Sequence, residues 1–306
     1  LIMVEVATIF RNYFLNWREE QLRPAGGKGS SGKRKDPDLQ ELVYSINRLV
    51  NERGFQGRFA AFIILLFDAN TGKTHMCHAG DSLVHVYNNA KRQTETITLP
   101  EAPAAGTFDN EMVAMGNGFR SVPRSFSVGD ALILFTDGLE EAKRVFRDEH
   151  FKPMKCNAES EAKEGAHGNH NLGEGDEEFG LDRVYTIVNA VFSRGSFSLR
   201  KYHNPVPDER LEFDFSGCKG TIEEAVIALV AVEKVFRIYP DPGAEKGDRV
   251  QVDRKIDEFL KEHFRQYEGY FRDPIESTDY PEYVWFPYLK EDEQYDDLTV
   301  LGIHKK

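Results

Sequence analysis

The apolar residues of this 306-residue chain recur at two spacings, one typical of helices and one typical of strands. Helical spacing predicts helices over residues 2–17, 38–54, 181–192, 221–238 and 252–264. Asp38 is a suitable cap for the second helix and Gly54 a suitable end, while residues 221–224 match a capping box. Between the first two helices, residues 23–37 are rich in Gly, Ser and Lys and predict a flexible linker.

Strand-like apolar runs fill the region between the second and third helices, and one more lies near the end. They cover residues 59–67, 74–79, 83–87, 94–99 and 131–135, with weaker candidates at 113–115 and 124–126 and a last strand at 298–303. Turn residues at 70–72 and 88–89 separate neighbouring runs. Successive hairpins predict mainly antiparallel sheet.

The pattern weakens after residue 147. Residues 156–178 are acidic and rich in Gly, which predicts a mobile loop. Residues 179–290 form an enlarged section with several helices, and residues 280–288 combine aromatic side chains with two prolines. We expect that last stretch to be an irregular lid.

Composition and charge narrow the possible functions. The formal net charge of −12 argues against binding to nucleic acid, whose phosphates require a basic surface. Three cysteines without Cys-x-x-Cys spacing indicate neither a disulfide framework nor a zinc site, which favours a cytoplasmic protein. No apolar run reaches the roughly 20 residues that span a bilayer.

Two acidic sequences carry the candidate chemistry. Asp137 follows the apolar run at 131–135 directly, and Gly138 allows a tight turn there. Asp296 and Asp297 directly precede the last strand. Asp-Gly pairs commonly form simple turns, but if the two strands are neighbours in one sheet, Asp137 and Asp296 converge at one edge.

Converging carboxylates repel one another unless a cation lies between them. A site built only from oxygen ligands suits Mg²⁺ or Mn²⁺ rather than Zn²⁺. Asp81 lies in another turn, as a turn former or as support for the site. His78 beside it is a weaker candidate, and His167 and His170 form a pair with nothing nearby to fix its geometry.

These residues resemble the metal-dependent serine/threonine protein phosphatases, in particular the bacterial branch named after stage II sporulation protein E. Phe-Thr-Asp-Gly at 135–138 and Asp-Asp-Leu-Thr at 296–299 carry the resemblance. Three further sequences agree in order: His-Ala-Gly-Asp-Ser at 78–82, the loop at 99–108, and Glu-Phe-Gly-Leu-Asp-Arg at 178–183.

The resemblance implies an α+β fold in which helices flank two mainly antiparallel sheets, an α-β-β-α sandwich. It implies that Asp137 and Asp296 bind Mn²⁺ or Mg²⁺, two ions in the complete domain, with Gly138, Asp297 and Asp81 in support. The activity implied is hydrolysis of phosphoserine or phosphothreonine in a protein. The resemblance further suggests an anti-sigma-factor antagonist as the substrate, within partner-switching signalling.

One family sequence is missing. The chain contains no Asp-x-x-Gly-His-Gly turn, which carries the first metal ligand of the family. We therefore expect residues 1–306 to be one partial phosphatase domain of a longer protein, without its first metal-bearing strands and with a sensor upstream. Such a fragment would be impaired or inactive. Two alternatives remain: a non-catalytic interaction module, and a phosphohydrolase that acts on small molecules.

Overall fold

The computed structural model describes the chain except for residue 1 and residues 23–35, 55–56, 82, 149, 154–169, 172–175, 201–209, 241–248 and 295. The expected linker at 23–37 and most of the expected acidic loop at 156–178 lie outside the described residues. The chain divides into two compact units, each described below by itself. The single phosphatase domain over 1–306 stays a prediction.

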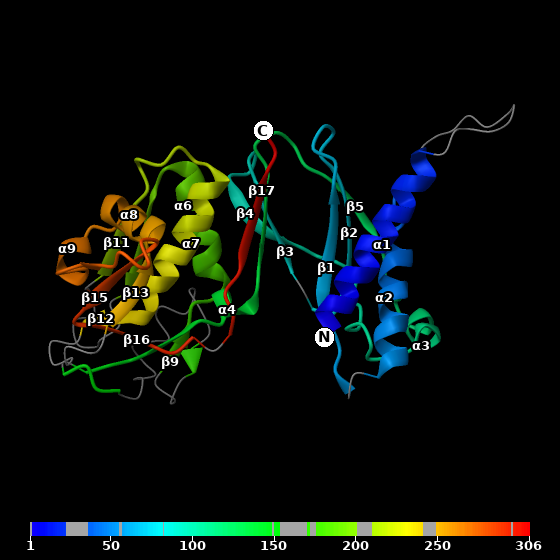
Figure 1. Ribbon diagram of the computed structural model, residues 1–306. Helices are drawn as coiled ribbons and strands as arrows, with labels where there is room; N and C mark the ends of the chain where they lie inside the picture. Colours follow the sequence, from blue (N-terminus) through cyan, green and yellow to red (C-terminus); the bar gives the residue numbers. More distant parts are fainter. Residues whose placement is uncertain are drawn as a thin grey trace, which may run out of the picture. The chain divides into compact units, whose positions relative to one another are not determined.

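The first unit packs two helices on a three-stranded antiparallel sheet (Figure 1). Its elements are α1 (Ile2–Leu22), α2 (Leu39–Arg53), β1 (Phe62–Phe67), β2 (Lys73–Ala79), α3 (Asn110–Met115) and β5 (Val122–Ser125), with strand order β1-β2-β5. Helix α2 buries Leu42, Val43 and Ile46 completely. Its ends follow the sequence signals, because the Asp38 side chain accepts a hydrogen bond from the Glu41 N–H and Gly54 ends the helix with φ +60°.

The expected weak strand at 113–115 is wrong. These residues end helix α3, and its N-cap residue Asp109 accepts a hydrogen bond at 2.8 Å from the Met112 N–H. Only Val113 of this helix is buried. One buried residue cannot distinguish a short helix from a short strand by hydrophobic periodicity. The hydrogen bond from the N-cap residue therefore determines that this segment is helical.

The second unit is organised around a four-stranded sheet of order β17-β6-β3-β4. Its strands are β3 (Val84–Asn88), β4 (Gln93–Ile97), β6 (Ala131–Phe135) and β17 (Val300–His304). Strands β17 and β3 both pair with β6 in antiparallel register, with Val300 opposite Phe135. Residues 131–133 are buried, as their apolar run predicts. The strands next to the two acidic sequences, β6 and β17, are therefore neighbours in one sheet.

Helices α6 (Leu181–Ser193) and α7 (Ile222–Arg237) lie side by side in this unit (Figure 1). The predicted capping box is present: the Thr221 side chain accepts from the Glu224 N–H, and the Glu224 side chain accepts from the Thr221 N–H. Both helices bury long apolar faces that include Val188, Val191 and Leu229. Together these observations confirm the predicted α+β class with antiparallel sheets flanked by helices.

The region between α6 and β17 contains more strand than the sequence suggested. Its elements are β10 (Ser196–Arg200), β11 (Arg210–Asp214), β12 (Ile238–Pro240), β13 (Arg249–Asp253), α8 (Arg254–His263), α9 (Tyr267–Tyr270), β14 (Ile275–Glu276), β15 (Tyr283–Pro287) and β16 (Leu289–Glu291). The sheets are β10-β11, β12-β16 and β13-β15-β14.

One expectation for this region is wrong. The irregular lid at 280–288 instead contains strand β15, in which Val284 and Phe286 are buried and pair with Val252 and Val250 of β13. The expected helix at 252–264 is confirmed as α8, which begins at Arg254 because Asp253 caps it by accepting a hydrogen bond from the Lys255 N–H at 2.8 Å. The alternating burial along β13 and β15 thus stabilises strand pairing here, although the two prolines disfavour a strand.

Part of the expected acidic loop is also ordered. Strand β9 (Asp176–Glu178) pairs with β7 (Lys143–Val145) and with β8 (His170–Asn171). Glu177 is buried between two buried arginines, Arg144 and Arg183. Burial alone would raise the pKa of Glu177, but the two guanidinium groups lower it to about 2. Glu177 therefore has a structural role, as the buried ion-pair partner of the two arginines.

His85 in β3 gives the second unit a pH-dependent stability. Its ring stacks on Phe135 at 4.5 Å between centroids, its Nδ1 lies 2.8 Å from the Tyr185 hydroxyl, and burial lowers its pKa to about 4. Between that value and the unfolded pKa of about 6.5, only the unfolded chain binds the proton, so stability falls as the pH drops.

We expect the wild type to lose about 2 kcal/mol between pH 7 and pH 5 through His85. Urea unfolding of the wild type and of His85→Phe at both pH values measures this contribution. The phenylalanine variant should show a smaller loss. Equal losses in both proteins would show that His85 titrates normally.

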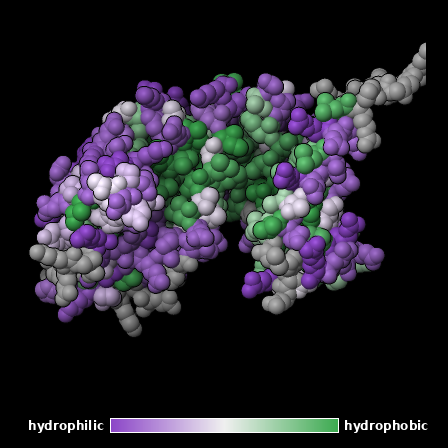
Figure 2. Space-filling model, viewed as in Figure 1, coloured by the Kyte–Doolittle hydropathy of each residue, from purple (hydrophilic) through white to green (hydrophobic). Residues whose placement is uncertain are grey.

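The surface over β17 is hydrophobic, and that over α8 and β15 is largely hydrophilic (Figure 2). Leu301 of β17 is 53% exposed. Within the described part of the chain, no helix is both long and apolar enough to cross a membrane.

Candidate metal centre

Thr136 joins the two acidic sequences. It follows β6, and its hydroxyl donates a hydrogen bond to the Asp297 carbonyl oxygen at 2.7 Å. The same hydroxyl oxygen accepts from the Thr299 N–H at 2.9 Å, and the Thr136 N–H donates to the Thr299 carbonyl at 3.1 Å. Three hydrogen bonds therefore fix the turn after β6 against the segment that leads into β17.

Gly138 allows these segments to touch. A Cβ atom at this position would lie 2.6 Å from the Asp297 carbonyl oxygen and 3.0 Å from the Asp296 carbonyl oxygen. These distances leave no space for any side chain, and the obstructing atoms are backbone. Gln294 adds a further tie, because its amide nitrogen donates to the Gly138 carbonyl at 2.8 Å. The glycine is required by close approach of the two chain segments.

The three aspartates at this junction are exposed to solvent. Asp137 Oδ1 accepts a hydrogen bond from the Gly138 N–H at 3.0 Å, and Asp296 Oδ1 accepts from the Asp297 N–H at 2.7 Å. Among the described residues, no lysine or arginine forms an ion pair with Asp137, Asp296 or Asp297. These carboxylates are therefore accessible to a cation from solvent.

Two buried oxygen atoms beside the turn have no hydrogen-bond donor among the described residues. They are Oε2 of Glu140, at the end of α4 (Asp137–Glu140), and Oε1 of Gln294. Burial raises the pKa of Glu140, and the negative charges of Glu141, Asp137 and Glu178 add to this effect. The area around the turn is therefore rich in oxygen acceptors and in negative charge.

This set of atoms fits Mg²⁺ or Mn²⁺, which prefer oxygen ligands. The ligands are not yet gathered, since no three His, Cys, Asp or Glu side chains already surround one point within the described ranges. A cation here would have to draw the exposed carboxylates inward and keep several waters. The donor atoms therefore suit such an ion in kind, while the described side chains as they stand are not placed to hold one. Sequence reasoning identified the aspartates and Gly138 but gave no signal for Gln294 or Glu140.

The remaining sequence candidates belong to other segments of the chain. Asp81 is an exposed residue of the first unit, in the bend after β2, and its supporting role stays a prediction. His78 is buried, and its Nε2 lies 2.7 Å from the Pro100 carbonyl oxygen, a contact that suits a structural histidine. His167 is outside the described residues. His170 lies in β8, and its side chain is not described.

Gly138→Ala should separate the two acidic segments. The added methyl would meet the Asp297 and Asp296 carbonyls, and the Asp297 carbonyl cannot move without breaking its hydrogen bond from Thr136. We expect a loss of about 1–3 kcal/mol in the free energy of unfolding, and a Mn²⁺ affinity at least about tenfold lower. Chemical unfolding and calorimetric titration measure both.

Gly269→Ala is the matched control, because a Cβ there meets nothing within 4 Å. It should unfold like the wild type and bind Mn²⁺ unchanged. If Gly138→Ala behaves like this control, the close approach of the two segments is not required.

Residues 1–172 match the family model described as Stage II sporulation protein E (SpoIIE). This match covers more than half of the chain, so the chain belongs to the SpoIIE family of PP2C-like phosphatases. The matched region includes Asp137 but ends before Asp296. No curated protein matches the chain.

Solved structures resemble this chain only at low sequence identity and low TM-score. The RsbU and RsbW domains of Rv1364c from Mycobacterium tuberculosis share 20% identity over 45% of this chain and 33% of that chain, with a TM-score of 0.30. The SpoIIE phosphatase domain from Bacillus subtilis, in a crystal form without domain swapping, shares 15% over 56% and 71%, with a TM-score of 0.28. The catalytic domain of PstP in complex with two manganese ions shares 15% over 45% and 62%, with a TM-score of 0.30.

The chain spans 33% of the Rv1364c structure and 53% of a structure of RsbX in complex with magnesium. It therefore corresponds to only part of several of the proteins that it resembles.

Proposed function

We propose that this protein hydrolyses phosphoserine or phosphothreonine in a protein substrate, with Mn²⁺ or Mg²⁺ bound between Asp137 and Asp296. The observation that carries the proposal is the contact of Gly138 with the Asp296 and Asp297 carbonyls in a chain of the SpoIIE family. That contact brings together two acidic sequences that are about 160 residues apart.

Each residue has a defined task in this proposal. Asp137 and Asp296 supply anionic oxygens to the cation, and Asp297 orients a water by accepting its hydrogen bond. When bound, the cation lowers the pKa of water and stabilises negative charge on the phosphoryl oxygens. Gly138 and Thr136 keep the two carboxylate-bearing segments together. Asp81 serves as a supporting residue.

Family membership supports the proposed substrate class. We propose a phosphorylated anti-sigma-factor antagonist as the substrate, in a cytoplasmic partner-switching pathway that an upstream sensor regulates. The net charge of −12 favours a protein substrate over nucleic acid.

A non-catalytic interaction module is the second candidate. Two observations favour it: the sequence lacks the Asp-x-x-Gly-His-Gly turn, and the described carboxylates do not already converge on one point. A chain that holds one cation can polarise a phosphate but does not hold a water between two ions. We therefore expect slow turnover, or none, from these 306 residues by themselves.

Phosphate release with Mn²⁺ from a phosphoserine protein and from p-nitrophenyl phosphate separates these functions. The proposal predicts slow release from the phosphoprotein that chelation abolishes, and that is lost in Asp137→Asn. Faster release from the small phosphate would indicate a small-molecule phosphohydrolase. No release from either, even from the longest soluble form of the protein, would identify a non-catalytic module.

A further inference from the structure

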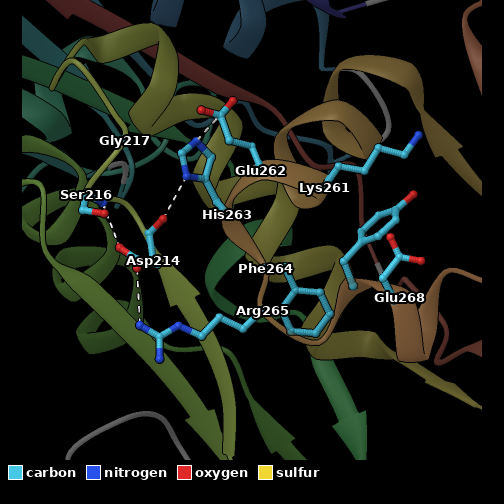
Figure 3. A pocket seen from close by; sticks show the side chains of 10 residues that line it. Asp214, Ser216, Gly217, Lys261, Glu262, His263, Phe264, Arg265 and Glu268 are labelled. Carbon is cyan, nitrogen blue, oxygen red and sulfur yellow. Dashed lines mark hydrogen bonds and ion pairs between the residues drawn. The ribbon is translucent and has the colours of Figure 1, made fainter.

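A pocket of about 480 Å³ lies in the second unit, beyond residues 1–172 that match the family model. It is formed by the end of β11, the turn that follows it, and the end of α8 (Figure 3). Its lining includes Asp214, Gly217, Glu262, His263 and Arg265. The residues of the candidate metal centre are absent from this lining.

His263 is held in one orientation at this pocket. The residue is 5% exposed, and its Nδ1 lies 2.8 Å from the Asp214 backbone carbonyl oxygen. A carbonyl can only accept, so Nδ1 is the donor of this ring and Nε2 is its acceptor nitrogen. Metal-binding histidines in proteins have this arrangement, in which one ring N–H is bound to a carbonyl and the other nitrogen faces the ion.

Cys218 lies beside this acceptor nitrogen. Its sulfur is 3.6 Å from His263 Nε2, so the thiol donates a hydrogen bond to the ring, and the residue is 3% exposed. A thiolate about 2.3 Å and an imidazole about 2.0–2.1 Å from one tetrahedral Zn²⁺ have their ligand atoms about this far apart. The Cys218 N–H donates to the Phe215 carbonyl at 3.0 Å, which fixes the turn that carries the sulfur. Two soft ligands are thus placed in advance by the fold.

Glu262 can supply a third ligand. Its carboxylate oxygen lies 3.9 Å from His263 Nε2 (Figure 3), and its side chain is 70% exposed, so it can turn at little cost. Gly217 leaves the space between them open, because a Cβ there would lie 3.5 Å from Glu262 Oε1 and 3.7 Å from His263 Cε1. As they stand, no three His, Cys, Asp or Glu side chains of the described residues are placed to hold a metal ion, so ligation by these three requires this rotation.

We propose that Cys218, His263 and Glu262 form a second metal site, which binds a zinc-type divalent cation with water at the fourth position. Sulfur and nitrogen ligands select such an ion over Mg²⁺ or Mn²⁺. The site is therefore chemically distinct from the oxygen-rich junction at Asp137. It would join the turn after β11 to the end of α8, and so stabilise the part of the chain that the family model does not match.

Binding exchanges a proton for the cation. Burial raises the pKa of the Cys218 thiol to about 11, with further contributions from Glu224 and Glu262, so the thiol is protonated at neutral pH. On binding, the S–H bond breaks, the sulfur binds the cation, and the proton passes to solvent.

Titration with Co²⁺, a coloured substitute for Zn²⁺, tests the site directly. The expected result is a thiolate-to-cobalt charge-transfer band that saturates at one equivalent and disappears when Zn²⁺ is added. Cys218→Ala should abolish the band, and Glu262→Gln should lower the Co²⁺ affinity about tenfold. Gly217→Ala, which narrows the space without strain, should also weaken binding.

Two controls assign the band. Cys156→Ala removes another of the three cysteines and should keep it, and Asp296→Asn should keep it because the candidate metal centre is separate. Circular dichroism verifies that each variant is folded. If Cys218→Ala does not fold, a Zn²⁺-dependent rise in the Tm of wild type that is absent in Glu262→Gln supports the site. No band in wild type, or a band that Cys156→Ala removes and Cys218→Ala keeps, overturns the proposal.

Discussion

Glu177→Ala should cost about 3–5 kcal/mol in the free energy of unfolding, the expected cost of breaking a buried ion pair on one side. Arg144 and Arg183 are 1% and 2% exposed, and both bond to this carboxylate, Arg183 at 2.9 Å. Without it, two guanidinium groups stay buried with one charged partner fewer. Unfolding by the denaturant guanidinium chloride measures this loss of stability.

The adjacent residue provides a matched control. Glu178 forms a longer ion pair of 3.7 Å with Lys143, whose side chain is 30% exposed. Glu178→Ala should therefore cost less than about 1 kcal/mol. Equal losses for Glu177→Ala and Glu178→Ala would show that the buried cluster does not anchor β7, β9 and α6 together.

The pH dependence of this cluster is distinct from that of His85. The folded pKa of Glu177 is about 2, below the unfolded value of about 4.3. Its contribution is therefore fully present above about pH 4.3 and is lost as the pH falls toward 2. As the pH is lowered, the loss of stability that His85 causes comes first, between about pH 6.5 and pH 4.

Asp296→Asn should lower Mn²⁺-dependent phosphate release at least about 100-fold, since changes to groups that only support a metal ligand already cost 10–100-fold. The variant should fold normally, or be slightly more stable without metal, because it removes one of several neighbouring negative charges. Phosphate release from a phosphoserine protein by the longest soluble form of the protein measures the effect.

Asp279→Asn is a suitable control, because Asp279 is an exposed aspartate of the same unit and not part of the acidic junction. It should release phosphate at the wild-type rate. If Asp296→Asn also retains that rate at saturating Mn²⁺, Asp296 is not a ligand and the catalytic centre lies elsewhere.

The junction of the two acidic sequences could be predicted because each signal was local. An apolar run that ends at Asp137-Gly138, and another that begins after Asp297, define strands β6 and β17 without knowledge of the rest of the fold. The caps of α2 and α7 were equally predictable, because Asp38 and Thr221 each accept a hydrogen bond from the first turn of the helix that follows them.

The contacts around that junction could not be predicted in the same way. Gln294 donates to Gly138 from 156 residues away, and no property of an isolated glutamine indicates this. Glu177 belongs to an acidic stretch that composition assigns to a loop, and only Arg144 and Arg183 make its burial favourable. Strand β15 was missed because its partner β13 lies about 30 residues earlier. Pairing between distant segments overrides local preference in each case.

The central claim is that Asp137 and Asp296 bind one cation together. Its most direct test is a Mn²⁺ titration in which electron paramagnetic resonance measures the concentration of free Mn²⁺. The wild type and Asp279→Asn should each bind one Mn²⁺ weakly, because Asp137 and Asp296 supply two anionic oxygens and water fills the other positions. Asp137→Asn and Asp296→Asn should each bind none measurably. Wild-type binding by either of these two variants would contradict a shared cation site at the Gly138 junction.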